Sequence, residues 1–335
     1  RYTRYTNWTS TTLLNYTKSF LNSGDLTLRA KVGYEAQKSK AYFLNVQAQG
    51  FPPTTDLIVA SVGATPIAAQ QDASDYAFNS ALSDISINFQ NRFVVSGSFR
   101  RDGSSRFGIN NRYGNFWSVG GTWNVDQENF LQNINFISQF KLRASYGLNG
   151  NAAIGNYDWR ALYGYGANYN QQPGSSPTVI GNADLTWELN KPLNVGIDIS
   201  VLKNRINLTA DYYVRKTSQL LLNEPLSLTS GFGTISKNIG SMENSGVELT
   251  LIASPVVTRN FQWDINLNYA RNKNKITSLV NKQDILSGVF IRREGYDFQT
   301  FYVRQYAGVD PANGDPLWYV DDTKGATTNV YANAQ

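Results

Sequence analysis

The chain has 335 residues, of which 13% are aromatic and only 16% are charged, against roughly 25% charged residues in soluble domains. It contains no cysteine and no histidine, which excludes a disulfide framework, histidine-based nucleophilic catalysis and the usual ligand sets for zinc or haem. The net charge of +5 is modest for this length and disfavours a nucleic-acid-binding protein. Low charge, many aromatics and abundant turn formers together predict an all-β protein.

Apolar and polar residues alternate along several segments, as expected for strands with one apolar and one polar face. The pattern is clearest in 195–215, where a tight connection at Lys203 and Asn204 joins two alternating runs. Several runs are longer than the five or six residues typical of soluble strands, and this length suits a tilted strand that crosses a bilayer. In chain order the alternating runs lie at 26–35, 117–125, 142–146, 195–201, 206–215, 247–251 and 263–269.

The connections between these runs alternate in length. We expect short ones at 89–92, 203–204 and 254–260, and one of medium length at 126–139. Short turns at one rim and long loops at the other are the layout of a bacterial outer-membrane barrel, whose long loops lie outside the cell. The sequence therefore predicts long extracellular loops near 36–80, 100–115, 149–180, 216–240 and 272–300.

A soluble β-sandwich or a solenoid would also alternate apolar and polar residues. A sandwich, however, has shorter strands and carries more Lys and Glu on its water-facing side. The polar positions here carry Asn, Ser, Thr, Asp and Arg, and aromatic residues cluster near strand ends as in interfacial girdles. The residue pattern therefore favours a membrane barrel without excluding the soluble folds.

The segment 100–130 resembles a signature segment of the SusC/RagA-type TonB-dependent outer-membrane transporters, and it reads RRDGSSRFGINNRYGNFWSVGGTWNVDQENF. The resemblance continues in collinear order and covers about 75–325, most of the chain. It implies a transmembrane antiparallel β-barrel of about 22 strands, closed by an N-terminal plug domain. The further segments that carry it are 140–157, 182–200, 204–222, 238–251 and 306–321.

The resemblance also implies a function, which is import without bond-making by a protein that is not an enzyme. The expected partners are the TonB complex, a SusD-like surface lipoprotein that acts as a lid, lipid of a Gram-negative outer membrane, and an oligosaccharide or peptide as cargo. No TonB box, plug or final aromatic-ended strand is recognisable. We therefore expect residues 1–335 to be part of one barrel domain, about a dozen strands, with the plug and the last strands outside this chain. The alternatives are a passive porin or adhesin-type barrel and a secreted glycan-binding β-protein.

The arginine-rich segment 99–116 suggests a phosphate loop, a nucleic-acid patch or a hairpin tip. Neither G-x-x-x-x-G-K-[ST] nor G-x-G-x-x-G occurs in it, and no helix follows. We interpret it as a structural hairpin motif that includes Arg106. In this motif Gly103 and Gly108 allow turns, and Asp102 pairs with nearby arginines.

Two long loops carry candidate contact residues. Aromatic side chains among amides can stack on sugar rings, and they can equally pack the loop or form the outer girdle; the candidates for substrate binding are Trp159, Tyr163, Tyr165 and Tyr169. Exposed apolar residues tend to mark partners, although these could fold over neighbouring loops instead; the candidates for contact with the lipoprotein are Leu220, Leu221 and Phe232.

The segment 310–316, DPANGDP, suggests a calcium loop, but Ala312 and Gly314 occupy positions that would need ligands. Its Asp-Pro and Asn-Gly pairs are ordinary turn formers. We expect no cofactor and no metal, with an irregular calcium site left open. No catalytic grouping such as G-x-S-x-G occurs.

Overall fold

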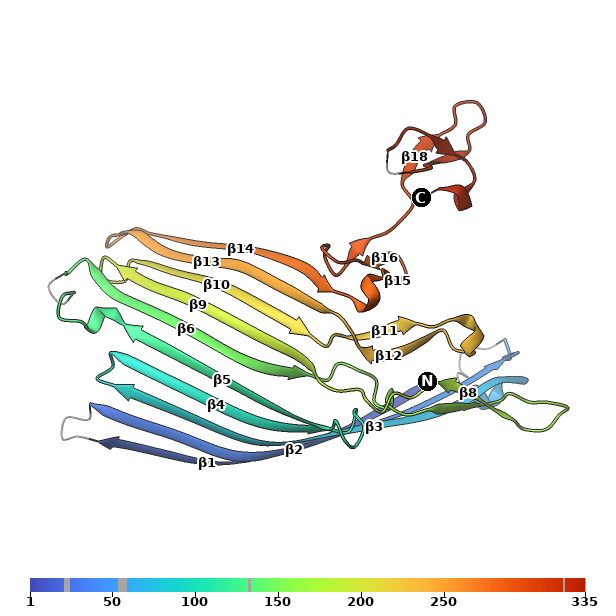
Figure 1. Cartoon of the computed structure of the whole chain (residues 1–335), viewed down its shortest axis with the longest axis horizontal. Coiled ribbons are helices and arrows are strands. Elements are labelled where there is room, and N and C mark those ends of the chain that lie inside the picture. The colour runs from blue at the N-terminus through green and yellow to red at the C-terminus, as the bar shows by residue number, and fades with distance from the viewer. Residues whose placement is uncertain (21–24, 54–58, 132–133, 322, 335) are drawn as a thin grey trace.

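Ten long strands form one antiparallel sheet in the order β1-β2-β3-β4-β5-β6-β9-β10-β13-β14. The structure is a computed structural model and describes residues 1–20, 25–53, 59–131, 134–321 and 323–334. Figure 1 shows the strands side by side in one curved wall, with short turns along one rim and long connections along the other. The strands are β1 (Tyr2–Phe20), β2 (Leu26–Gln49), β3 (Thr65–Phe89), β4 (Phe93–Ser104), β5 (Tyr113–Asn124), β6 (Ile137–Asn151), β9 (Glu188–Val201), β10 (Ile206–Ser218), β13 (Ser241–Val257) and β14 (Gln262–Ser278).

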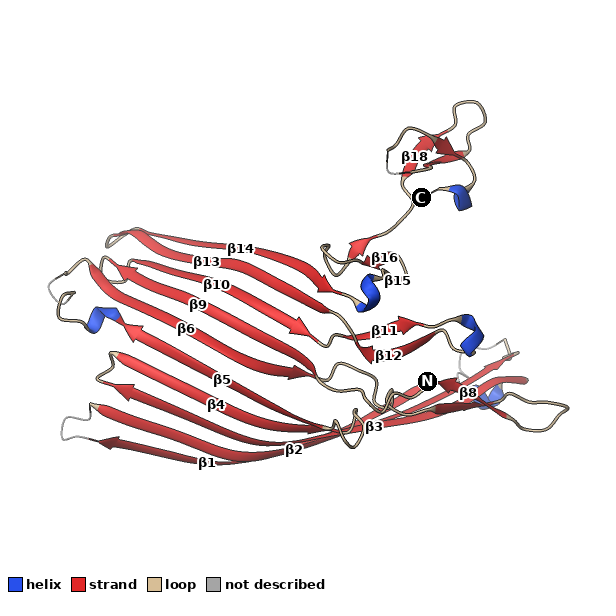
Figure 2. Cartoon of the chain, in the orientation of Figure 1, coloured by secondary structure: helices blue, strands red, loops and turns tan. Residues whose placement is uncertain are grey.

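The long connections contain small sheets of their own, and Figure 2 shows only short helical turns among the described residues. No helix in the described part of the chain is long and apolar enough to cross a membrane. The small strands are β7 (Leu162–Tyr165), β8 (Ser175–Val179), β11 (Leu221–Pro225), β12 (Thr234–Asn238), β15 (Ile285–Ser287), β16 (Phe290–Arg292), β17 (Thr300–Phe301), β18 (Tyr306–Val309), β19 (Pro316–Tyr319) and β20 (Thr327–Thr328). The helical turns are η1 (Ala60–Val62), η2 (Val125–Gln127), η3 (Leu228–Ser230), η4 (Val280–Lys282) and η5 (Tyr331–Asn333).

The prediction of a long loop over 36–80 is wrong. β2 continues to Gln49 and β3 begins at Thr65, so the connection spans 50–64, of which 54–58 lie outside the described residues. The two strands stay paired from Leu26–Phe89 to Gln49–Thr65. At 24 and 25 residues they are far longer than the roughly ten residues that a bilayer requires. Their outer parts therefore extend past the apolar band, where neither face has to be apolar and the alternation disappears.

Strands continue into the predicted loops 100–115, 216–240 and 272–300, whereas the loop predicted over 149–180 ends only at residue 187 and the turn predicted over 203–204 spans 202–205. The long connections span 105–112, 152–187, 219–240 and the residues after Ser278, whereas the loop predicted over 272–300 included the end of β14. The short ones span 90–92, 202–205 and 258–261, and the one predicted to be of medium length spans 125–136. β13 reaches Val257 through a register shift at Ser254 and Pro255, since proline has no N–H to donate to the ladder.

One face of the sheet is apolar and exposed. Direct partners in an antiparallel pair share a face, and Val195, Tyr212 and Val247 form such a row across β9, β10 and β13. Their side chains are 48%, 49% and 38% exposed. A broad exposed apolar surface marks contact with a partner or a membrane, and the apolar band of an outer-membrane barrel contacts lipid. We name this the outward face and the opposite, polar face the inward face.

Two buried clusters stabilise the rim that carries the long connections. The Trp187 cluster joins the hairpin β4–β5 to the 152–187 connection and consists of Phe107, Phe116, Ala152, Leu185 and Trp187. The Ile276 cluster joins the end of β14 to β11–β12 and consists of Leu220, Leu222, Ile239, Ile276, Leu279 and Ile285. Loops of this length would lose much conformational entropy if they ordered alone, so this burial is what fixes them.

Glu128 anchors the connection between β5 and β6 at the other rim. Its carboxylate accepts hydrogen bonds from Arg92 Nε at 3.1 Å and from Trp123 Nε1 at 3.0 Å, and it forms an ion pair with Arg92. These donors, Arg92 first, hold the pKa of Glu128 below its ordinary value because they stabilise the ionised form.

Replacing Trp187 with Ala should loosen the long-loop rim. The indole contacts Phe107 and Phe116 at ring distances of 5.2 Å and donates to the Arg112 carbonyl oxygen at 3.2 Å. Losing a buried Trp costs about 3–5 kcal/mol, so proteolysis within 152–187 should accelerate strongly. Trp263→Ala, at an exposed outward position, is the matched control. Equal cleavage rates in the two variants would contradict this role.

Glu128 should contribute stability that acid removes. Because folding lowers its pKa, the contribution is present above the ordinary titration range of a glutamate and is lost as pH falls through that range toward the lowered value. The difference in unfolding temperature between wild type and Glu128→Gln should therefore be constant near neutral pH and shrink in acid. The exposed Glu248, changed to Gln, serves as the control. A difference that stays constant into acid would refute the assignment.

Candidate functional site

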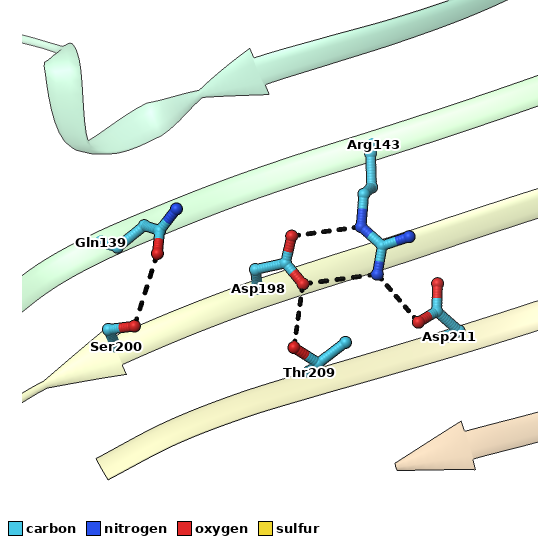
Figure 3. Close-up of polar contacts among 6 residues, drawn as sticks. All are labelled: Gln139, Arg143, Asp198, Ser200, Thr209 and Asp211. Atoms are coloured by element: carbon cyan, nitrogen blue, oxygen red, sulfur yellow. Dashed lines mark hydrogen bonds and ion pairs between the residues drawn. The ribbon is translucent and has the colours of Figure 1, made fainter. Parts of the chain in front are cut away.

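Arg143 connects three strands on the inward face of the sheet (Figure 3). From β6 its Nε donates to Asp198 Oδ2 on β9 at 3.1 Å, and its Nη2 donates to Asp211 Oδ2 on β10 at 2.8 Å. Thr209 adds a hydrogen bond to Asp198 Oδ1 at 3.1 Å. The guanidinium therefore crosses β9 completely, and both carboxylates are ion-paired and unavailable as free acids or bases.

Gly196 is what makes this crossing possible. It is the direct partner of Arg143 on one side and of Asp211 on the other. A Cβ at this position would lie 2.6 Å from Arg143 Cζ and 2.5 Å from Asp211 Oδ1. Position 196 thus needs glycine for the close approach of two side chains, not for backbone freedom.

A second inward network lies on β2, β3 and β4. Arg100 donates to Asp102 Oδ1 at 2.6 Å, to Glu35 Oε1 at 2.9 Å and to Ser80 Oγ at 2.9 Å. Between the two networks the wall is hollowed by about 230 Å³, because small residues such as Ser96, Gly120 and Ser145 line it. The inward wall is therefore polar, ion-paired and concave. In both networks the carboxylates are ion-paired with an arginine and are therefore not free acids or bases.

The hairpin motif predicted around 99–116 needs its glycines for a different reason from the one expected. Gly103 and Gly108 are absent from the glycines with positive φ. A Cβ added at Gly103 would lie 2.3 Å from Asn79 Oδ1, and a Cβ added at Gly108 would lie 2.6 Å from the Ala183 carbonyl oxygen. Asp102 pairs with Arg100, whereas Arg106 does not join this pair. Close packing, not turn formation, requires the two glycines.

Arg106 instead ties the hairpin to its neighbours. It donates to the Ala152 carbonyl oxygen at 2.9 Å and to Asn156 Oδ1 at 3.0 Å. Its guanidinium lies 4.2 Å from the centre of the Tyr76 ring. These three contacts fix its position, and Arg106 also lines a cavity at the long-loop rim.

This rim pocket has a volume of about 510 Å³ and is formed where all four long connections meet. Its walls come from 153–158, from β11–β12 and from β15–β16, and its charged lining residues are Arg106, Asp158 and Arg292. Arg292 packs on Phe298 at 4.7 Å, and its buried Nε has no hydrogen-bond partner among the described residues. Burial lowers the pKa of Arg292, yet a guanidinium stays charged at neutral pH. The Arg292 guanidinium lines the pocket and forms no ion pair among the described residues, so it suits an anionic or carbonyl oxygen of a ligand.

The rim pocket could not be found from the sequence, since Arg106, Asn223 and Arg292 are distant in the chain and carry no motif. The four aromatic candidates do not line it. Trp159 is partly buried against the Trp187 cluster and donates to the Ser105 carbonyl oxygen at 3.2 Å, so it packs the loop. The other three lie in or near the β7–β8 hairpin, and Tyr163, Tyr165 and Tyr169 are 62%, 92% and 85% exposed.

The candidates for lipoprotein contact are buried or partly buried against other parts of the chain. Leu220 is only 3% exposed and belongs to the Ile276 cluster, so the expectation that it contacts a partner is wrong. Leu221 packs against the Trp187 cluster, and Phe232 is half-buried. Figure 1 shows the hairpin β11–β12 beyond the end of β10, and at its base Leu220 packs with Ile276 and Leu279 of the β14 end.

Among the described residues, no group of three or more carboxylate side chains could hold a metal ion. The 310–316 segment forms a turn in which Asp310 Oδ1 accepts from the Ala312 N–H at 2.9 Å and Asn313 Oδ1 accepts from the Asp315 N–H at 3.0 Å. These are the bonds of an ordinary Asx turn.

The family model for the TonB dependent receptor-like β-barrel matches residues 1–333, nearly the whole chain. The chain belongs to this family. It is 38% identical over 238 residues, 71% of its length, to TonB-dependent receptor P39 of Formosa agariphila, and 35% identical over 249 residues, 68% of its length, to TonB-dependent receptor SusC of Bacteroides thetaiotaomicron. It spans 23% and 25% of these two relatives.

Among solved structures, the RagAB peptide transporter matches 99% of this chain with a TM-score of 0.86 at 31% identity, and the chain covers 37% of that protein. The outer membrane transporter YddB of Escherichia coli, at 14% identity and a TM-score of 0.59, shares the fold. The resemblance to SusC/RagA-type receptors and the all-β barrel class predicted from the sequence are confirmed. TonB-dependent receptors of this type are transporters and not enzymes, as the sequence led us to expect.

In this TonB-dependent receptor barrel, Gly196→Ala should break the bond from Arg143 to Asp211. The added methyl group would occupy the path of the guanidinium, so the variant should lose about 1 kcal/mol of stability from this partly exposed bond. In a double-mutant cycle, Asp211→Asn should then cost much less in the Gly196→Ala background than in wild type. Gly121→Ala, where a Cβ meets no heavy atom within 4 Å, is the control. Additive effects would show that Gly196 has no part in the network.

Proposed function

We propose that the whole protein imports an oligosaccharide or a peptide across the outer membrane of a Gram-negative bacterium. In this proposal the TonB complex supplies the energy, and a SusD-like lipoprotein covers the entrance. The observation that carries it is the match of 99% of the chain, at 31% identity, to the RagAB peptide transporter. In this proposal the ten-stranded sheet of this chain forms part of the wall of one larger barrel, whose lumen is closed by a plug domain.

The polar inward face supports passage of a hydrophilic cargo. The Arg143 and Arg100 networks pair each cation with two carboxylates. Charges on a barrel interior are tolerated because water or opposite charges compensate them. A solute would therefore pass along a wall whose arginines are already ion-paired with carboxylates and do not bind it strongly.

The rim pocket supports recognition of charged cargo at the cell surface. Its two guanidinium groups and one carboxylate favour a peptide, which has charged ends, over a neutral oligosaccharide. Arg292 is the residue that we assign to a cargo carboxylate or carbonyl group. The exposed Tyr163, Tyr165 and Tyr169 are further contacts for cargo or for the lipoprotein, because exposed tyrosines supply large contact area at low entropic cost.

The test is uptake by cells that express the full-length protein. Fluorescent oligopeptides and oligosaccharides should be offered with and without a functional TonB complex, and uptake of one class should stop when TonB is absent. Uptake that is unaffected by loss of TonB would support a passive porin and overturn the proposal.

Arg292→Gln should weaken cargo binding by about tenfold or more, since a charge-assisted hydrogen bond in a pocket contributes about 1.5–3 kcal/mol. The matched control is Arg293→Gln. Arg293 is its neighbour in sequence and already pairs with Asp284 at 2.7 Å, so its loss should leave cargo affinity unchanged. Binding to purified protein by calorimetry checks both variants. Equal affinities in the two would remove Arg292 from the site while leaving the transport function intact.

A further inference from the structure

Five basic side chains gather on the outward face near the long-loop rim. They come from β9, β10 and β14, and on β14 they occupy every second position. We name them the basic patch, which consists of Lys191, Lys216, Arg271, Lys273 and Lys275, all exposed.

The orientation of this patch follows from its neighbours on β14. Asn272 accepts a hydrogen bond from Tyr213 at 3.0 Å, and Asn274 Oδ1 accepts one from the Phe298 N–H at 2.6 Å. Ile276 is fully buried in the cluster that bears its name. These even-numbered side chains point inward. Successive side chains alternate between faces, so the odd-numbered cations lie on the outward face with Leu267 and Tyr269.

The strand register concentrates the charge. Lys191, Lys216, Glu243 and Lys275 are successive partners in one row across β9, β10, β13 and β14. Lys191 and Lys216 face each other directly, an arrangement that destabilises a sheet unless an anion lies between them. Glu243 is the only carboxylate in this row, and its contact with Lys216 is long, at 3.9 Å.

A hollow of about 360 Å³ lies within this row. Lys191, Lys216 and Glu243 line it together with the small hydroxyl side chains of Ser218 and Thr277. It is therefore a concave site with cations and hydroxyl donors on the face that meets lipid. A phosphate group fits this chemistry, because it accepts several charge-assisted hydrogen bonds at once.

The patch begins where the apolar band ends. Outward positions toward the short turns are apolar, as at Val201, Ile206 and Trp263. Tyr212 and Tyr269 mark the other limit of the band, at the level where barrels place their aromatic girdle. At about 3.3 Å per residue, Lys273 lies about 13 Å beyond Tyr269 along β14. The patch therefore stands at the depth of the lipid headgroups in the outer leaflet.

We propose that the basic patch binds phosphate groups on lipid headgroups of the outer leaflet, which would fix the depth and rotation of the barrel beside its loop rim. Clusters of Lys and Arg next to a membrane attract anionic headgroups at about 1 kcal/mol per side chain, or about fivefold in affinity. The proposal rests on the outer-membrane location of the barrel and is independent of cargo and of TonB.

The test uses full-length protein in maltoside detergent, with a diphosphorylated lipid-A-type glycolipid, its dephosphorylated form and inorganic phosphate as probes. Wild type should bind the phosphorylated lipid, rise in unfolding temperature and retain native lipid in intact-complex mass spectrometry. The triple variant Lys216→Gln, Lys273→Gln, Lys275→Gln should bind on the order of 100-fold more weakly. The dephosphorylated lipid should produce little shift.

The matched control removes three cations from the short turns by changing Lys203, Arg205 and Arg259 to Gln, and it should bind as wild type does. A second triple variant, Lys216→Arg, Lys273→Arg, Lys275→Arg, should also keep the affinity, because it keeps the charge; this separates loss of charge from a folding defect. Equal binding by the triple Gln variant, or by the dephosphorylated lipid, overturns the proposal. A full shift with inorganic phosphate alone would overturn the lipid as ligand and indicate a site for soluble anions.

Discussion

The constraint on which the rest of the structure depends is that backbone N–H and C=O groups cannot stay unpaired in hydrocarbon. Each strand from β2 to β13 in the main sheet pairs with a strand on both sides, so the ladder is continuous across the wall. Because this ladder holds the strands together, their side chains need no packed core within the membrane band. The buried clusters among the described residues lie instead at the long-loop rim, where the chain leaves the ladder and packing has to replace it.

The fixed spacing of the ladder also explains the inward networks. Neighbouring strands lie about 4.8 Å apart, so an arginine that bridges across a whole strand must pass over the residue between its partners. Arg143 passes over Gly196 to reach Asp211, and Arg100 reaches Glu35 beside Ser80. In both networks a small residue on the middle strand leaves the path open. The small residues of the inward face thus allow these ion pairs to form across a strand, and they also make the face concave.

The sequence predicted the parts of the fold in which the two faces of a strand meet different surroundings. The alternation of apolar and polar residues predicted the two strands within 195–215, because one face of these strands meets lipid and the other meets the lumen. It failed over 36–49, where the paired strands extend past the membrane and the ladder persists without a pattern. The sequence also does not reveal whether a glycine is required for a positive φ angle or for close packing, and the turn role predicted for Gly103 is therefore wrong. The sequence does not show that Leu220 is buried, because its burial depends on contacts with Ile239 and Ile276, which are distant in the chain.

The sequence could not predict the rim pocket, because four connections that are distant in the chain form it. Its two arginines can nevertheless be assigned different tasks from their contacts. Arg106 is held by a carbonyl oxygen, an amide and the ring of Tyr76, so its wall of the pocket keeps its shape when the pocket is empty. Arg292 packs on Phe298, lines the pocket and forms no ion pair among the described residues. A site that is already ordered loses little entropy when a ligand binds. We therefore expect Arg106 to set the geometry and Arg292 to supply the hydrogen bond that cargo completes.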